Sequence, residues 1–287
     1  MLPVGLIGGA LLHRWMEYVT FLSPYLIFAM LFITYCRIEI RDLRIGRYQL
    51  ILLAVQMLLS AFVYFALLPV GHTVAEGVFI CVFIPTATAA PVITAMLGGS
   101  ISKVATYSLL CNVFVSITGP VVLAAVGDHS EYTFMQSVGI ISAKVFPLLI
   151  LPIVGAWLVS SKMRKVHSYL AKNQSISFYL WAIALFIIVG SCVSFVINHW
   201  SPDSSVEMIY LSLGALGVCL IQFKLGRMVG SRFNDAVTGG QSLGQKNTVL
   251  AVWLALAYMN PVASVAPAAY IAWQNIINSW QLIKRHS

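Results

Sequence analysis

Charged residues are scarce in this sequence. Asp, Glu, Lys and Arg make up only 9% of the 287 residues, whereas about a quarter of the residues in a typical soluble domain are charged. Hydrophobic residues account for 60% of the chain, and its mean hydropathy is +0.89. So few charges cannot cover a surface in water, and the sequence therefore predicts an integral membrane protein.

Motifs for enzyme chemistry are also missing. The six histidines lie in loops or at segment ends without the His-Glu-x-x-His spacing of a zinc enzyme, and the chain has no serine-nucleophile or phosphate-loop motif. The five cysteines occur singly in apolar segments without C-x-x-C spacing, which is typical of small core residues. We therefore expect no enzyme activity, no cofactor and no bound metal ion.

Basic residues outnumber acidic ones, which gives a net charge of +8. In a soluble domain this excess would suggest binding to nucleic acid. Here the basic residues fall in short loops between apolar runs, as is typical of the charges that orient membrane proteins. The expected partner is the lipid bilayer, and no nucleic acid is expected.

About ten apolar segments follow one another along the chain. A helix needs about 20 apolar residues to cross a hydrocarbon core of about 30 Å, so the first segment is too short for a regular span and is expected to be shortened or tilted. The segments are 1–12, 18–36, 50–70, 73–97, 104–126, 134–159, 176–197, 206–221, 235–259 and 262–283.

The basic residues alternate with these segments. All but three of the 17 Lys and Arg residues follow even-numbered segments; the exceptions are Arg14, Lys144 and Lys246. The positive-inside rule then predicts a multi-pass protein of the inner (plasma) membrane with both termini in the cytoplasm. If the first segment does not span, only the amino terminus changes side.

The segments group as five plus five, residues 1–127 and 128–287. An odd number in each half makes the second half cross the membrane in the opposite sense, as in the inverted repeats of many secondary transporters. The fourth member of each half, about 73–97 and 235–259, is interrupted, by PTATAAP (85–91) and by GGQSLGQKN (239–247). Matched interruptions predict a binding site near the midplane; the alternative is that Pro and Gly merely kink two packed helices.

Four stretches of the chain carry a wider pattern: SPYLIFAMLFITYCRIEIRDLR (23–44), FIPTATAAPVIT (83–94), GQKNTVLAVWLALAY (244–258) and PAAYIAWQNIINSW (267–280). In this order and spacing they resemble the bile acid:sodium symporter family and its bacterial homologues over nearly the whole chain. The resemblance implies an all-α fold of ten helices in two inverted repeats, with the two broken helices crossing in a core domain packed on a panel domain. It also implies sodium-coupled uptake of organic anions by alternating access.

The chain departs from that family where the family holds sodium. Matching the crossovers places Ala90 and Pro91 at sodium-binding Ser and Asn positions, Ser242 at a glutamate and Lys246 at a glutamine. A hard cation prefers several oxygen ligands with a carboxylate among them, and this site has lost the carboxylate and gained a positive charge. The positions that keep or approximate the family's polar residues are Gln56, Ser108, Asn112, Gly244 and Asn247.

We therefore expect Lys246 to replace the bound cations, so that transport does not require sodium. Its ammonium can donate hydrogen bonds to carbonyls freed at the breaks, and a charge at the bilayer centre costs at least about 2.5–3.5 kcal/mol, which disfavours a chance lysine. One alternative is a conventional sodium-coupled symporter. Another is a lysine that snorkels or pairs with Asp235 or Glu76. Proton exchange by the buried ammonium also stays open, since burial disfavours its charged form.

The expected substrate is a small organic anion. The second halves of both broken helices would begin near the midplane at Val92 and Thr248 and present positive dipole ends beside Lys246. Neutral hydrogen bonds are expected from Thr86, Thr88, Ser242, Gln245, Asn247 and Thr248. A channel, an antiporter and a non-transporting receptor are the rivals, although an antiporter would need an acidic pair that the sequence lacks.

Lys144 is the other cation within a segment. It either lines the same cavity or pairs with a distant carboxylate, and the sequence leaves both open.

Overall fold

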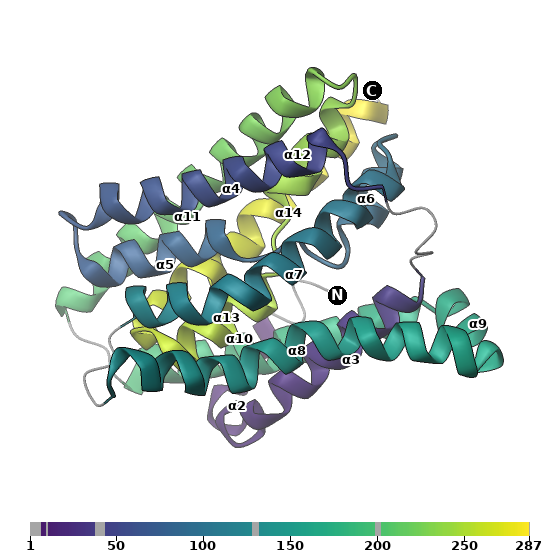
Figure 1. Cartoon of the computed structure of the whole chain (residues 1–287). Helices are drawn as coiled ribbons and strands as arrows, with labels where there is room; N and C mark the ends of the chain where they lie inside the picture. Colours follow the sequence, from purple (N-terminus) through teal and green to yellow (C-terminus); the bar gives the residue numbers. More distant parts are fainter. Residues whose placement is uncertain (1–6, 10, 38–43, 128–131, 199–201, 287) are drawn as a thin grey trace.

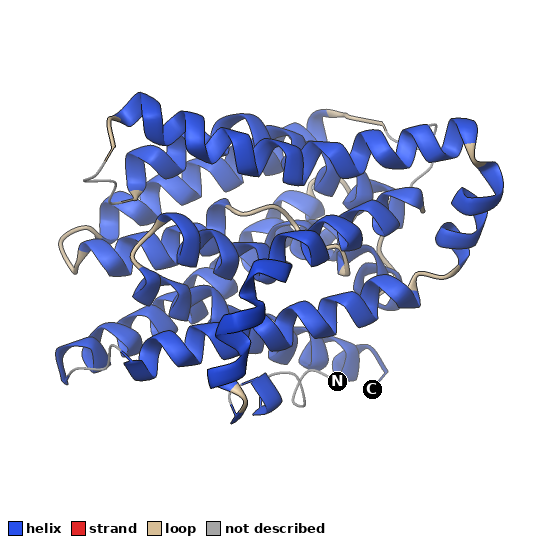
Figure 2. Cartoon of the chain, turned by 90° about the horizontal axis from the view of Figure 1, so that it is seen from below, coloured by secondary structure: helices blue, strands red, loops and turns tan. Residues whose placement is uncertain are grey.

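All regular elements of the described chain are helices. The computed structural model describes residues 7–9, 11–37, 44–127, 132–198 and 202–286. Five helices are long and apolar enough to cross a membrane, which confirms the prediction of an all-α membrane protein (Figure 2). They are α4 (Arg47–Leu67), α7 (Ile101–Val126), α8 (Phe134–Lys162), α10 (Ser175–Asn198) and α11 (Pro202–Ser231).

Shorter helices complete the chain. The first predicted segment, 1–12, lies largely outside the described residues. The remaining elements are α2 (His13–Val19), η1 (Thr20–Leu22), α3 (Ser23–Cys36), α5 (His72–Phe83), α6 (Ala90–Met96), α9 (Arg164–Lys172), α12 (Ala236–Gly244), α13 (Thr248–Tyr258), η3 (Pro261–Ser264) and α14 (Val265–His286).

Both of the segments that the sequence interrupts are broken in the structure. Segment 73–97 forms α5 and α6, and segment 235–259 forms α12 and α13. Pro85 follows Ile84, the residue that caps the end of α5, and it cannot supply the N–H that would continue the helix. The simple kinking of two continuous helices is therefore not what the chain does.

One predicted boundary is wrong. The eighth segment was expected to end at 221, but α11 continues to Ser231. Its last turns carry Lys224 and Arg227, which end the apolar run while the helix continues, because a helix can leave the membrane before it stops. The residues after the sixth segment form α9, a helix on which the sequence analysis made no prediction.

The helices pack in two groups (Figure 1). One group joins α2, α3, α8 and α10, and the other joins α4, α5, α11, α12 and α14. Between them lie α7, which packs along α8, and α13, which contacts both α10 and α14. Both breaks therefore lie in the interior of the molecule, where protein rather than lipid surrounds the freed backbone.

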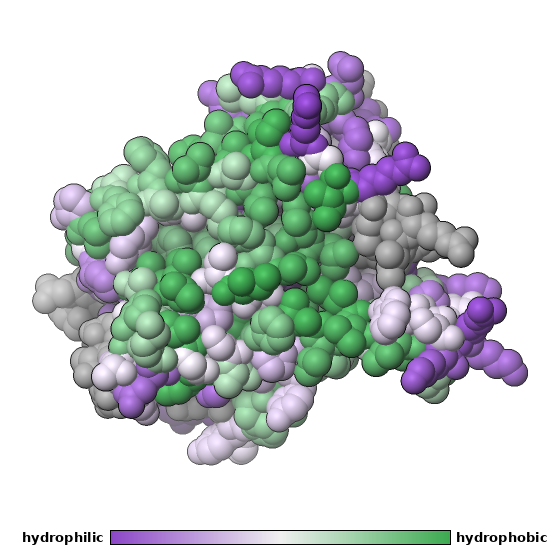
Figure 3. All heavy atoms as spheres, viewed as in Figure 1, coloured by the Kyte–Doolittle hydropathy of each residue, from purple (hydrophilic) through white to green (hydrophobic). Residues whose placement is uncertain are grey.

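The outer surface is apolar over the middle of the molecule. In Figure 3 hydrophobic side chains cover the centre, and the strongest hydrophilic groups lie at the top and at the right. On α4, for example, Leu58, Phe62 and Phe65 are 71%, 68% and 67% exposed. Exposed apolar residues over such an area are expected where the surroundings are lipid.

The hairpin of α11 and α12 brings two backbones into direct contact. Asn234 adopts a left-handed conformation (φ 55°) in the turn, and Asp235 accepts a hydrogen bond from the Thr238 N–H at the start of α12. A Cβ atom on Gly226 would collide with the carbonyl oxygen of Gly239, and a Cβ on Gly239 would collide with that of Gly226. The missing side chains let the broken helix sit against its neighbour.

We expect Gly239→Ala to lower the free energy of unfolding by about 1–3 kcal/mol, since overpacking forces the backbones apart. Gly217→Ala is the matched control on α11, because a Cβ at Gly217 meets open space. Thermal unfolding of the purified protein in detergent measures both. Equal stability of the two variants would contradict the close approach.

Candidate functional site at the crossing of two broken helices

The two breaks cross and pair through their backbones. Thr86 and Lys246 form an isolated antiparallel bridge. The Ala87 N–H donates to the Gln245 carbonyl at 3.1 Å, and the Asn247 N–H donates to the Pro85 carbonyl at 2.9 Å. Backbone groups that neither helix can satisfy are thus satisfied by the other break.

The Lys246 ammonium binds the carboxyl end of α5. Its Nζ donates to the Val82 carbonyl at 2.9 Å and to the Ile84 carbonyl at 3.2 Å. The side chain is 1% exposed. Carbonyls at the end of a helix carry partial negative charge, so a cation there is stabilised both by hydrogen bonds and by the helix dipole.

Two glutamines bind the neighbouring carbonyls of α5. Gln56 Nε2 donates to Phe83 O at 2.9 Å and to Ile84 O at 3.1 Å. Gln222 Nε2 donates to Cys81 O at 3.3 Å. The last four carbonyls of the broken end therefore all have donors, which come from α4, α11 and the second break.

The alternative in which Lys246 snorkels or pairs with Asp235 or Glu76 is wrong. Asp235 pairs with Lys103 at 3.2 Å, and the Glu76 carboxylate lies 3.5 Å from His72. Among the described residues, the partners of the Lys246 ammonium are backbone carbonyls. The charge is buried without a carboxylate to neutralise it.

A cavity of about 640 Å³ opens beside the crossing. Six of the residues predicted from the sequence line it or lie at its wall: Thr88, Pro91, Gln245, Lys246, Asn247 and Thr248. The walls come from both packed groups, since α3 and α10 face α6, α13 and α14 across it. None of its lining residues is acidic.

The other six predicted residues lie outside the cavity, in the packed support of the crossing. Thr86 Oγ1 donates to Ser242 O at 2.7 Å, and Gly244 O accepts from the Tyr270 hydroxyl at 2.8 Å. Ser108 Oγ lies 3.5 Å from Thr86 O. Asn112 Nδ2 donates to Ser108 O at 2.7 Å. Gln56 binds the end of α5.

Sequence analysis missed the polar side of α14. Gln274, Asn275 and Asn278 line the cavity, and Gln274 Oε1 accepts the Lys246 backbone N–H at 3.0 Å. The signal was present as Gln and Asn at helical spacing in WQNIINSWQ, a polar stripe within an apolar segment. Gln174, Phe178 and Trp181 of the opposite wall were missed as well.

The polar stripe continues into a buried amide network. Gln245 Nε2 donates to Gln241 Oε1 at 2.9 Å. Gln241 Nε2 in turn lies 3.3 Å from Asn278 Oδ1 and 3.1 Å from Gln281 Oε1. This network fixes α12 against α14 and holds the Gln245 side chain at the cavity wall.

Two cations and one free amide group give the cavity its polarity. Arg37, at the end of α3, lines it together with Lys246. Asn247 Oδ1 accepts the Leu250 N–H at 3.3 Å and so caps α13, which leaves its Nδ2 group buried without a partner among the described residues. Within those residues, no three His, Cys, Asp or Glu side chains are placed to hold a metal ion.

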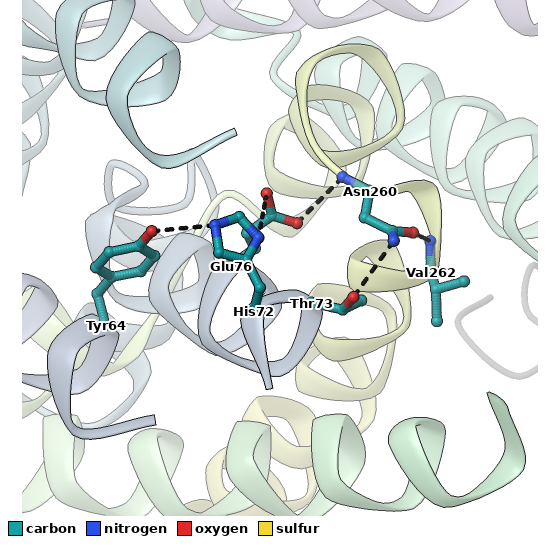
Figure 4. A network of polar contacts seen from close by, with 6 residues as sticks. All are labelled: Tyr64, His72, Thr73, Glu76, Asn260 and Val262. Atoms are coloured by element: carbon teal, nitrogen blue, oxygen red, sulfur yellow. Dashed lines mark hydrogen bonds and ion pairs between the residues drawn. The ribbon is translucent and has the colours of Figure 1, made fainter. Parts of the chain in front are cut away.

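A separate polar network lies at the other end of α5 (Figure 4). Glu76 is fully buried and accepts the Asn260 backbone N–H at 3.1 Å, while His72 lies between Glu76 and the Tyr64 hydroxyl. Asn260 Nδ2 also contacts Thr73 Oγ1 at 3.3 Å. These contacts tie the start of α5 to the junction of α13 and η3.

Neither role predicted for Lys144 is seen. Its side chain is exposed on α8 and does not line the cavity, and no described carboxylate forms an ion pair with it.

No protein-family model matches the chain, and no curated protein matches its sequence.

We expect Gln56→Leu to lower the free energy of unfolding by about 2 kcal/mol or more. The change leaves Phe83 O without its donor and removes the acceptor of the Tyr107 hydroxyl, which lies 2.5 Å from Gln56 Oε1. Denaturation of the purified protein measures it. Ser137→Ala is the control, because the buried Ser137 hydroxyl has no hydrogen-bond partner in the described chain; a loss of similar size there would count against the capping role of Gln56.

Proposed function

We propose that the protein is a secondary transporter of a small organic anion in the inner membrane, and that the Lys246 ammonium takes the place of bound cations. The observation that carries the proposal is the pair of hydrogen bonds from Lys246 Nζ to Val82 O and Ile84 O at the crossing. On this proposal the chain is a divergent bacterial member of the bile acid:sodium symporter family whose transport does not depend on sodium.

The chemistry of the broken end supports this substitution. Freed backbone carbonyls are oxygen ligands of the kind that sodium prefers. Here an ammonium group binds two of them, and glutamine amides bind the others. The family resemblance implies bound sodium beside a glutamate at this place, and here an ammonium stands without that glutamate.

The polarity of the cavity supports an anionic substrate. Arg37 and Lys246 are the charged residues that line it, and Asn247 Nδ2 is an unused donor at its wall. A carboxylate in the cavity can pair with the Arg37 guanidinium, and the buried charge of Lys246 adds to the positive potential there. Phe178 and Trp181 supply apolar surface for the remainder of the molecule. The volume of about 640 Å³ lies within the range of about 300–1,000 Å³ that is usual for small-molecule sites.

The position of the cavity supports alternating access. Thr34 and Arg37 lie at the end of α3, Ile101 and Ser102 begin α7, and Ser175 begins α10. The positive-inside rule predicts that these ends lie in the cytoplasm. On this proposal the cavity opens toward the cytoplasm. On the far side, the Cys192 sulfur of α10 contacts the Ser264 hydroxyl of η3 at 3.3 Å, and η3 packs on α5 and α14 of the other group.

The two breaks support a ten-helix arrangement of two inverted repeats, 1–127 and 128–287. Each lies in the fourth segment of its half, and the two pair as an antiparallel bridge. In this arrangement α2, α3, α8 and α10 form the panel domain, and the second group with α6, α7 and α13 forms the core domain.

Uptake into liposomes tests the role of Lys246. We expect wild-type protein to take up a carboxylate from a panel of labelled keto acids, aromatic acids and steroid acids at the same rate in sodium and in potassium. Lys246→Gln is expected to lower that rate at least tenfold, because it removes the positive charge that binds Val82 O and Ile84 O. Lys144→Gln, which removes an exposed cation of α8, should stay within twofold of wild type.

Uptake that stops when sodium is replaced by potassium would contradict the proposal and favour the sodium-coupled symporter. Binding without flux for every substrate would favour a receptor. A pH gradient imposed on wild type without sodium separates the two roles of the lysine: the gradient drives accumulation if Lys246 exchanges its proton, and it does not if the charge is fixed.

A crosslink tests the proposed movement. Ser264→Cys places a second sulfur beside the native Cys192, and oxidation is expected to join them and to arrest transport. A reducing agent should restore the rate. Ser264→Ala, treated identically, controls for the loss of the hydroxyl. Full transport by a completely crosslinked protein would mean that α10 and η3 do not separate during the cycle.

A further inference from the structure

The helix α9 forms a short amphipathic connection between two long apolar helices. One residue separates α9 from α8, and two residues separate it from α10. At about 1.5 Å per residue, the 29 residues of α8 extend over about 44 Å, which exceeds the hydrocarbon core of about 30 Å. Since its connections are so short, α9 must lie in the headgroup layer on the side where α8 ends.

One side of α9 is basic. Arg164, Lys165 and Lys172 point to the same side of the helix as Ser168 and Tyr169, and together with Asn173 they line a shallow depression of about 460 Å³. All six side chains can donate hydrogen bonds. The hydrophilic atoms over α9 form a distinct group at the lower right of Figure 3.

The opposite side of α9 is fixed to the protein. Leu170 packs against the main hydrophobic core. Gln174 Nε2 donates to Ile33 O of α3 and to Leu170 O, both at 3.0 Å. The basic side is therefore held outward, away from the core.

The surroundings of α9 are apolar and aromatic. Trp157 of α8 and Tyr179 of α10 are 53% and 56% exposed, and Tyr169 of α9 is 62% exposed. Exposed Trp and Tyr residues are typical of the membrane interface. The sequence contains no acidic residue between Glu131 and Asp203, so neither adjoining helix supplies a carboxylate to the basic side.

We propose that the basic side of α9 binds the phosphate of an anionic phospholipid headgroup. The guanidinium of Arg164 can bind two phosphate oxygens, Lys165 and Lys172 add charge, and the hydroxyls of Ser168 and Tyr169 donate further hydrogen bonds. The acyl chains then lie along the exposed apolar sides of α8 and α10. This site does not depend on the transport proposal.

Native mass spectrometry of the whole protein in detergent tests the site. With phosphatidylglycerol and phosphatidylcholine of the same acyl chains, wild type is expected to retain phosphatidylglycerol at least fivefold better. In R164Q/K165Q/K172Q the preference should vanish, since each cation near an anionic headgroup contributes about fivefold in affinity. K224Q/R232Q/K284Q loses the same charge elsewhere and should change the preference by less than threefold.

Three outcomes would overturn the proposal: no preference in wild type, an equal loss in both triple variants, or displacement of the lipid by millimolar inorganic phosphate. The last would mean that free phosphate is the ligand. A melting temperature for each variant establishes that the protein compared is folded.

Discussion

The structure depends on how the buried carbonyl groups at the end of α5 are satisfied. A helix that stops inside a membrane leaves carbonyls that lipid cannot hydrogen-bond, each at a cost of several kcal/mol. Here Lys246, Gln56 and Gln222 bind them from three different elements. Removing one donor affects more than one helix, because the same contacts hold the two breaks in register. The crossing therefore satisfies carbonyls that would otherwise cost free energy, and it also holds the two broken helices together.

A lysine in this position differs physically from a bound ion. An ion can leave and return with each cycle, and it then couples its own gradient to the substrate. An ammonium on a covalent side chain stays, so it can hold the crossing together and attract an anion without using a sodium gradient. The cavity lies next to it and contains Arg37 but no acidic residue. In the proposed transporter, the energy for accumulation would then come from protons, from exchange or from the substrate gradient itself.

The sequence predicted the first break because Pro85 acts locally on the backbone. The second break was predicted to begin at Gly239, but Gly239 and Gly240 lie within α12 against α11, and the helix ends only at Gly244. The sequence also singled out Lys246, whose charge contrasts with every neighbour. It did not predict the polar stripe of Gln274 and Asn278, since amides in a membrane helix are equally common as packing contacts. The helix α9 was missed because its basic residues were assigned only to topology. The environment of Lys144 depends on which side of α8 faces outward, which local sequence does not determine.

The most direct test of the central claim is an experimental structure determined in sodium and again in thallium, whose strong scattering marks monovalent cation sites. We predict Lys246 Nζ within hydrogen-bonding distance of Val82 O and Ile84 O in both, without an ion between these oxygens. An ion bound to either carbonyl, or a lysine side chain turned toward solvent, would contradict the account.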